Sequence, residues 1–210
     1  MGLTESQTEF FRSDFGDFWP FLQKTDFERD PLLKEMEKEC TDRAVYTIGP
    51  WFGRLLNFLV RFGRVSSALE FGTASGYSAV WIARGLAKPG RLVTLEQDTE
   101  LAQLAVSNIE RAGLAESVDV LVGDAHETIT RLSTPVDFMF IDCAHQTALS
   151  AAKSLLRTGG LFVCDNVGFS NKDEFNDALT TCPYLESLYL HCYLKGRVPE
   201  NQAFSISMKI

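Results

Sequence analysis

The segment from Ala68 to Ser78 constrains the fold of this chain more than any other. A short apolar run ends at Glu70, and a turn that contains Gly72 and Gly76 then leads into an amphipathic stretch beginning at Tyr77. This order predicts a strand, a tight turn and the start of a helix, a geometry that presents free backbone N–H groups to an anionic or polar ligand. An ordinary turn between a strand and a helix has the same pattern, so the turn alone does not identify a ligand.

The spacing of the two glycines limits which cofactor could bind at this turn. Gly72 and Gly76 are four residues apart, so the turn has neither the G-x-G-x-x-G pattern of dinucleotide-binding folds nor a G-x-x-x-x-G-K-[ST] phosphate loop. A cofactor without a pyrophosphate fits better, and S-adenosylmethionine (SAM), which has a single carboxylate, is such a cofactor. The missing pyrophosphate pattern disfavours an NAD-dependent dehydrogenase.

From Val65 onward, apolar runs alternate with amphipathic segments. Strands are expected at residues 67–71, 91–96, 118–122, 136–141 and 161–165, and helices at residues 77–88, 99–112, 125–132 and 147–157. Pro89-Gly90, Gly113 and Gly159-Gly160 are expected to end helices. This alternation predicts an α/β fold with a parallel sheet and helices on both faces. Two successive runs near residues 185–194 and 203–210 predict an antiparallel pair at one edge.

The first sixty residues are predicted to be helical and carry an apolar stripe at helical spacing. The stripe contains Phe11, Phe15, Phe18, Trp19 and Leu22. It would pack on the sheet, on a partner subunit or over the substrate as a lid. A second helix is expected at residues 51–62. We interpret residues 1–210 as a single domain, with residues 1–45 as a helical extension or cap and residues 46–210 as the core.

Composition narrows the range of partners. The formal net charge of -8 at pH 7 disfavours nucleic acid as a partner. No apolar run is long enough to span a bilayer, and no secretory signal is apparent. The five cysteines are scattered without a C-x-x-C pair, which is typical of reduced thiols. We therefore expect a cytoplasmic protein that acts on a small molecule, and the aromatic stripe is compatible with a homodimer.

A carboxylate stands at the end of each of the first five predicted strands. These residues are Glu70, Glu96, Asp124, Asp142 and Asp165. Because the carboxyl ends of parallel strands meet at one edge of a sheet, where ligands bind, we expect these side chains to surround one site. Single acidic residues are common in loops, but five at corresponding strand ends indicate a function.

Two of these positions suit a nucleoside cofactor. Glu96 follows Gly72 by about 24 residues and is placed to accept hydrogen bonds from ribose hydroxyls. Asp124 can accept a hydrogen bond from the adenine amino group, while the N–H group of Ala125 can donate to the ring.

Two further strand ends suit a metal ion. Asp142, Asp165 and the adjacent Asn166 would converge from neighbouring strands. Two carboxylates and an amide oxygen form a set of hard donors that suits Mg²⁺. Asp165-Asn166 is also compatible with a cap at the start of a following helix.

Together, these segments resemble the class I SAM-dependent O-methyltransferases, specifically the catechol O-methyltransferase-like, divalent-metal-dependent branch. The resemblance covers roughly residues 46–210. The matching segments are residues 69–78, 93–96, 122–125, 140–142 and 164–167. It implies a Rossmann-like class I methyltransferase fold with a mostly parallel seven-stranded sheet, an antiparallel edge strand and N-terminal helices. It also implies that Asp142, Asp165 and Asn166 bind Mg²⁺ or Mn²⁺.

The resemblance also implies a set of cofactor contacts. Ser78 would hold the SAM carboxylate, and the segment around Ile48 would fold over the cofactor. The expected cofactor-binding residues are Ile48, Glu70, Gly72, Thr73, Ser78, Glu96, Gln97, Asp124, Ala125 and Asp142. A bound metal ion would lower the pKa of a substrate hydroxyl and align its oxygen with the methyl group of SAM.

His145 departs from the family pattern. The family commonly has a lysine as general base three residues after the first metal aspartate, and this chain has His145 three residues after Asp142. A histidine can take a proton at neutral pH, so His145 and Asp142 are the expected catalytic residues. A metal ligand, a donor to the substrate or a solvent-facing residue at a helix start are the other interpretations of His145.

The resulting prediction is transfer of a methyl group to a hydroxyl of a small phenolic or vicinal-diol substrate, with assistance from a metal ion. Ala144 and residues 199–204 depart from the family's pocket wall, so catechol itself is not the expected substrate. Methylation of a hydroxylated nucleoside in tRNA would use the same catalytic residues but needs a basic surface. A SAM-binding protein without catalysis is the third interpretation.

Overall fold

The computed structural model describes residues 30–169, 172–193 and 201–210. The chain divides into two units, Met1–Pro31 and Leu32–Ile210, of which only the second is described in detail below. The expected aromatic stripe at residues 11–22 lies outside the described residues.

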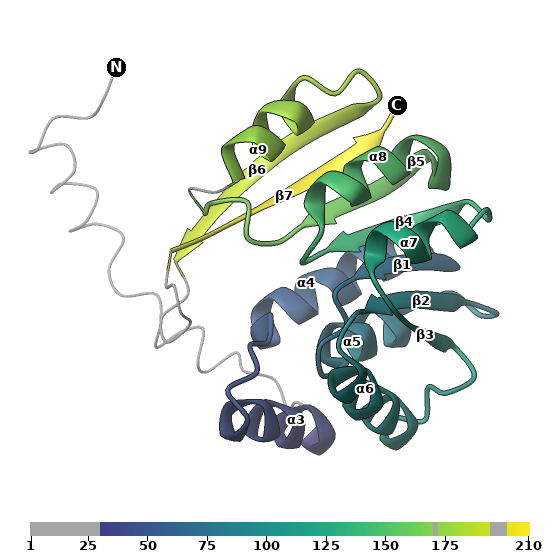
Figure 1. The fold of residues 1–210 in the computed structure, drawn as a ribbon, viewed down its shortest axis with the longest axis vertical. Helices are drawn as coiled ribbons and strands as arrows, with labels where there is room; N and C mark the ends of the chain where they lie inside the picture. Colours follow the sequence, from purple (N-terminus) through teal and green to yellow (C-terminus); the bar gives the residue numbers. More distant parts are fainter. Residues whose placement is uncertain (1–29, 170–171, 194–200) are drawn as a thin grey trace, which may run out of the picture. The chain divides into compact units, whose positions relative to one another are not determined.

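A seven-stranded sheet forms the centre of the second unit, with the strand order β3-β2-β1-β4-β5-β7-β6 (Figure 1). The strands are β1 (Ser67–Phe71), β2 (Arg91–Glu96), β3 (Val118–Val122), β4 (Val136–Ile141), β5 (Leu156–Cys164), β6 (Leu185–Tyr193) and β7 (Asn201–Lys209). Strands β1 to β5 are parallel, and β7 is antiparallel to both of its neighbours, β5 and β6. The predicted α/β fold with an antiparallel pair at one edge is confirmed, and β6 is the strand at the edge.

Helices cover both faces of this sheet (Figure 1). They are α3 (Pro31–Asp42), α4 (Gly49–Phe62), α5 (Tyr77–Gly85), α6 (Thr99–Arg111), α7 (Ala125–Thr128), the 3₁₀-helix η1 (Ile129–Arg131), α8 (His145–Leu155) and α9 (Asp173–Thr180). Side chains alternate along β4: Phe138 and Phe140 belong to the apolar core shared with α3 to α6, whereas Met139 and Ile141 belong to the core shared with α8 and α9. The near-continuous apolar run of β4 follows from its burial on both faces.

The prediction that Gly159-Gly160 ends a helix is wrong. Helix α8 ends at Leu155, β5 begins at the next residue, and both glycines lie within β5. The pairing of β4 with β5 shifts register in this stretch, and Gly159 has a φ of 76°. Glycine adopts this left-handed conformation without steric strain, so Gly159 can accommodate the irregular pairing in this part of β5.

Candidate active site

The turn between β1 and α5 has the backbone geometry that its sequence predicts. Gly72 and Gly76 have φ values of 96° and 81°, in the left-handed region. A Cβ atom on Gly72 would lie 3.2 Å from Sγ of Cys143, so the turn passes close to the end of β4. Ser78, the second residue of α5, is buried beside the turn. The strand, turn and helix therefore bring the N-terminus of α5 to the carboxyl edge of the sheet.

Glu70 is fully buried at the end of β1. Its Oε2 atom accepts a hydrogen bond from Thr94 Oγ1 at 2.6 Å, and the same hydroxyl lies 2.6 Å from Oγ1 of Thr73. The Oε1 atom has no hydrogen-bond partner among the described residues. Burial raises the pKa of Glu70 to about 8, although the nearby hydroxyl groups of Ser78 and Thr94 oppose this rise. A buried carboxyl oxygen without a partner is a candidate acceptor for a ligand.

Glu96 connects the end of β2 to this turn. Its Oε2 atom accepts a hydrogen bond from the N–H group of Ala74 at 2.8 Å, and Oε1 accepts from the N–H group of Asp98 at 2.9 Å. Only 9% of Glu96 is exposed. The two bonds fix the carboxylate, and each oxygen keeps capacity to accept a second hydrogen bond, for example from a hydroxyl.

The remaining expected cofactor residues lie near the same edge or before α4. Asp124 ends the connection from β3, and its carboxylate accepts a hydrogen bond from the N–H group of His126 at 2.7 Å. Ala125 is the first residue of α7 and is half-buried, while Gln97 is exposed after β2. Ile48 is buried directly before α4.

Asp142 and Asp165 follow the ends of the neighbouring strands β4 and β5. The Oδ1 atom of Asp142 accepts a hydrogen bond from Nδ2 of Asn166 at 2.7 Å, and Oδ1 of Asp165 accepts from the N–H group of Asn166 at 2.8 Å. Asn166 has a φ of 61°, a conformation that asparagine tolerates better than most residues. No helix begins at this point, so the interpretation of Asp165-Asn166 as a helix cap is wrong.

The donor chemistry of these three residues fits a hard divalent cation. Rotation of the Asn166 amide by half a turn exchanges its nitrogen and oxygen, which places an oxygen toward Asp142. Two carboxylates and one amide oxygen are ligands that Mg²⁺ and Mn²⁺ accept. Among the described residues, no three Asp, Glu, His or Cys side chains are placed to hold a metal ion together, so a metal ion here would depend on the amide oxygen.

His145 is the first residue of α8 and only 4% of it is exposed, so the solvent-facing interpretation is wrong. Its Nε2 atom lies 2.9 Å from the carbonyl oxygen of Asp165, and Nδ1 lies 3.1 Å from Nζ of Lys172. A carbonyl oxygen only accepts, so Nε2 carries the proton and Nδ1 accepts a hydrogen bond from the lysine. The ring also packs edge-on against Phe175.

The surroundings of His145 change its acidity. Burial lowers the pKa of His145, the hydrogen bond to Asp165 opposes this effect, and the positive charge of Lys172 adds to it. Lys172, which precedes α9, was not predicted as a site residue. No local motif marks it, because its contact with His145 joins segments that are distant in the sequence.

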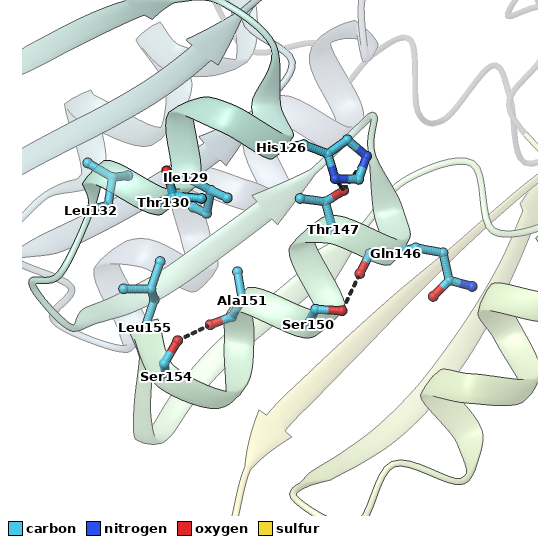
Figure 2. A pocket seen from close by; sticks show the side chains of 10 residues that line it. All are labelled: His126, Ile129, Thr130, Leu132, Gln146, Thr147, Ser150, Ala151, Ser154 and Leu155. Carbon is cyan, nitrogen blue, oxygen red and sulfur yellow. Dashed lines mark hydrogen bonds between the residues drawn. The ribbon is translucent and has the colours of Figure 1, made fainter.

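A cavity of about 520 Å³ lies between α7–η1 and α8 (Figure 2). Its lining consists of His126, Ile129, Thr130, Leu132, Gln146, Thr147, Ser150, Ala151, Ser154 and Leu155. Oγ1 of Thr147 lies 2.8 Å from Nδ1 of His126, which connects the two walls. The predicted site residues all lie within residues 30–169, and none of them lines this cavity. It adjoins the predicted site at His126 and Gln146, which directly follow Ala125 and His145.

Known proteins resemble this chain in sequence and in structure. A family model described as O-methyltransferase matches residues 23–181. The chain is 38% identical to a catechol O-methyltransferase of Niastella koreensis over 67% of each protein, and 39% identical to one of Mycobacterium tuberculosis over 70% of each. The crystal structure of an O-methyltransferase from Bacillus cereus in complex with S-adenosylhomocysteine (SAH) has a TM-score of 0.82 and 26% identity, and the match covers 94% of this chain and 99% of that one.

The family match covers most of the chain and includes the glycine turn and the strand ends with their acidic residues. The fold, the turn and these relatives lead to the same assignment. The chain belongs to the O-methyltransferase family, as a class I SAM-dependent enzyme of the catechol O-methyltransferase-like type.

Proposed function

We propose that this enzyme methylates a hydroxyl group of a small phenolic or vicinal-diol molecule with assistance from a divalent metal ion. The observation that carries this proposal is the hydrogen bond between Asp142 and Asn166 beside Asp165, at the sheet edge that holds the glycine turn. Asp142, Asp165 and Asn166 would hold Mg²⁺ or Mn²⁺. A cation bound there would lower the pKa of a coordinated substrate hydroxyl toward neutrality.

The proposed cofactor contacts use groups that the fold already holds in place. Glu96, fixed by two backbone N–H groups, would accept hydrogen bonds from the ribose hydroxyls of SAM. Ser78 at the start of α5 would hold the carboxylate, where the helix N-terminus favours negative charge. The unpartnered Oε1 atom of Glu70 would accept a hydrogen bond from the amino group. Asp124 and Ala125 would bind the adenine.

The remaining proposed cofactor residues shape the site around these groups. Gly72 lets the turn approach the end of β4, and Thr73 bonds to Thr94 beside Glu70. Ile48 would cover the cofactor from the start of α4, and Gln97 would contact its ribose end.

His145 would influence the reaction through Lys172 rather than as a free base. Both ring nitrogens of His145 are engaged within the protein, one by Asp165 and the other by Lys172. The ring therefore holds an ammonium group near the ends of β4 and β5. An ammonium donor at this point would stabilise an acceptor oxygen as it becomes anionic. In this proposal His145 is a positioning residue and Lys172 is the group that faces the substrate.

Mn²⁺ binding tests the proposed metal site. Loss of the free-ion EPR signal would be followed with SAH present, on the wild type, on Asp142→Asn and on Asp119→Asn. Asp119 is a matched control because it is an exposed carboxylate of β3 that pairs with Arg91. Binding that is lost in Asp142→Asn but kept in Asp119→Asn supports the site. Absence of binding in the wild type refutes assistance by a metal ion.

Paired substrates test the proposed substrate class. Methyl transfer from SAM would be measured with aromatic vicinal diols and with the corresponding single-hydroxyl compounds, with Mg²⁺ and with a chelator. Two adjacent oxygens can share one cation, so we expect the diols to react faster and to depend on the metal ion. Equal rates for both substrate sets, unaffected by the chelator, would contradict the proposal.

We also propose a cytoplasmic location, one domain over residues 1–210 with residues 1–45 as its cap, and a homodimer. Cys40, Cys143, Cys164 and Cys182 are free thiols, which favours a reducing compartment. The net charge of -8 favours a small-molecule substrate over a nucleic acid. Within the described residues, no helix has both the length and the apolar character to cross a membrane. Light scattering on the full chain tests the dimer.

A further inference from the structure

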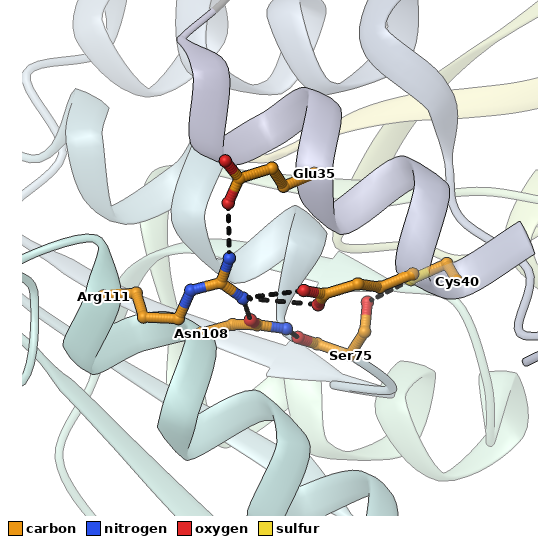
Figure 3. A network of polar contacts seen from close by, with 6 residues as sticks. Glu35, Cys40, Ser75, Asn108 and Arg111 are labelled. Carbon is orange, nitrogen blue, oxygen red and sulfur yellow. Dashed lines mark hydrogen bonds and ion pairs between the residues drawn. The ribbon is translucent and has the colours of Figure 1, made fainter. Parts of the chain in front are cut away.

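Ser75, in the middle of the glycine turn, is held by two helices (Figure 3). Sγ of Cys40 in α3 donates a hydrogen bond to Oγ of Ser75 at 3.1 Å, and Nδ2 of Asn108 in α6 donates to its carbonyl oxygen at 3.0 Å. Cys40, Ser75 and Asn108 are each at most 2% exposed. Buried polar groups have few alternative partners, so these bonds restrict where the turn can lie.

Arg111 connects Asn108 to α3. Its Nη1 atom donates to Oδ1 of Asn108 at 2.8 Å and lies 3.2 Å from Oε1 of Glu39, while Nη2 donates to Oε2 of Glu35 at 2.7 Å. In Figure 3 the guanidinium group lies between α3 and the Asn108 side chain. Arginine only donates and a carbonyl only accepts, so the amide of Asn108 has a single orientation that satisfies both neighbours. Arg111 therefore sets the direction in which Asn108 donates.

The two residues after Ser75, Gly76 and Tyr77, also contact α6 and α3. A Cβ atom on Gly76 would lie 3.2 Å from Cα of Ala105, so the backbone of the turn rests against α6. The hydroxyl of Tyr77 donates to Oε1 of Glu37 in α3 at 2.6 Å. On the other side of Ser75, the N–H group of Ala74 is bonded to Glu96. A shift of Ser75 would therefore move a backbone group bound to the proposed ribose-binding carboxylate.

We propose that Asn108 and Arg111 are positioning residues for the cofactor, which set the SAM-binding turn through Ser75 and so make cofactor affinity depend on the contact between α3 and α6. This role rests on the proposed cofactor contacts of the turn. Neither residue contacts the proposed metal-binding residues in any hydrogen bond described above. The expected effect is therefore on binding of the cofactor, with little effect on the rate once the cofactor is bound.

Arg111→Gln tests this role, with Arg91→Gln as the matched control. Arg91 also makes an exposed ion pair, with Asp119 at 2.8 Å, on strands β2 and β3. We expect the SAH Kd and the KM for SAM to rise about five- to tenfold in Arg111→Gln, with kcat at saturating SAM unchanged. Arg91→Gln should leave these constants unchanged. Arg111→Lys should restore part of the affinity, since one ammonium group cannot replace all the guanidinium contacts.

Hydrogen exchange distinguishes a positioning role from a loss of overall stability. In the ligand-free protein, amide exchange in a peptide covering residues 72–78 should be faster in Arg111→Gln than in the wild type or in Arg91→Gln. Asn108→Asp keeps the side-chain shape but removes the N–H donor that faces the carbonyl oxygen of Ser75. It should therefore weaken SAH binding at least as strongly as Arg111→Gln does.

Two results would overturn this positioning role and leave the proposed cofactor contacts intact. An unchanged SAH Kd in Arg111→Gln, or equal loss in Arg91→Gln, would show that the two residues do not position the turn. Failure of the wild type to bind SAH would instead refute the proposed cofactor contacts and this role with them. Mn²⁺ binding by the same variants reports separately on the metal site.

Discussion

Nδ1 of His145 accepts a hydrogen bond from Nζ of Lys172 at 3.1 Å, while Nε2 of the same ring donates to the carbonyl oxygen of Asp165. The ring thus joins the residue before α9 to the end of β5. Because neither nitrogen is free, an effect of His145 on methyl transfer should pass through Lys172.

This relationship predicts that His145 and Lys172 act as one unit. His145→Gln and Lys172→Gln should each lower kcat by about 10²-fold, the size of effect that a positioned proton donor or acceptor supplies. The double variant should be no slower than the slower single variant. Steady-state rates at saturating SAM measure this, with Lys153→Gln, an exposed lysine of α8, as the control. Effects that multiply would show that the two residues act independently.

The raised pKa of Glu70 predicts how stability changes with pH. In the unfolded chain a glutamate titrates near pH 4.3, whereas in the ligand-free fold Glu70 titrates near pH 8. Between these values the fold retains a proton that the unfolded chain has released. The stabilisation that this proton gives is therefore complete below about pH 4.3 and is lost as the pH rises toward 8, by about 1.4 kcal/mol per pH unit.

Glu70→Gln should remove this dependence, because glutamine does not titrate. We expect the ligand-free variant to be more stable than the wild type at pH 8, and its free energy of unfolding to change less between pH 6.5 and 8. The lowered pKa of His145 affects stability mainly below about pH 6.5, where the unfolded chain takes up the proton. Burial also raises the pKa of Cys40, Cys143 and Cys164, which adds a loss of stability toward pH 8. The wild type and the variant share these contributions, so the difference between their slopes isolates Glu70. Urea unfolding provides the measurement, and Glu174→Gln is an exposed control. If the free energy of unfolding of Glu70→Gln changed with pH as steeply as that of the wild type, the raised pKa of Glu70 would be contradicted.

The two hydrogen bonds of Glu96 predict a loss of cofactor affinity in Glu96→Gln. Both carboxylate oxygens accept from backbone N–H groups, and glutamine would turn an N–H₂ group toward one of these donors. We expect SAH affinity, measured by calorimetry, to fall about 10- to 100-fold. Glu100→Gln, an exposed acidic residue at the start of α6, should bind like the wild type. Wild-type affinity in Glu96→Gln would remove Glu96 from the proposed site.

Much of the fold could be predicted from the sequence, because the strands that are buried on both faces are nearly continuous apolar runs. The observed bounds of β1 to β4 are those expected, and a carboxylate lies at or just beyond the carboxyl end of each of these neighbouring strands. The sequence does not predict the early start of β5, because Gly159-Gly160 has the composition of a helix end but lies within the strand, where its pairing with β4 shifts register. Local composition does not distinguish these two uses of a glycine pair.

Contacts between side chains that are far apart in the sequence could not be predicted from the sequence. Lys172 and His145 are 27 residues apart, and Asn108 and Ser75 are 33 apart. Asn108 occupies an ordinary helical position in the sequence, and only the packing of α6 on the turn buries it. The approach of the acidic residues at the strand ends was easier to predict, because the carboxyl ends of parallel strands meet at one edge of the sheet.

Gly76 and Gly113 have similar backbone conformations but different surroundings. Alanine substitutions at the two positions therefore distinguish the effect of a steric clash from the effect of backbone strain. Gly76 and Gly113 have φ values of 81° and 69°, so alanine at either position should destabilise the protein by about 1 kcal/mol through its backbone alone. A Cβ atom on Gly113 would meet nothing within 4 Å, whereas one on Gly76 would lie 3.2 Å from Cα of Ala105. Gly76→Ala should therefore lose more stability in urea unfolding, and it alone should weaken SAH binding, because the turn must move away from α6. Equal losses of stability with unchanged SAH affinity would mean that the turn and α6 can separate without affecting the cofactor site.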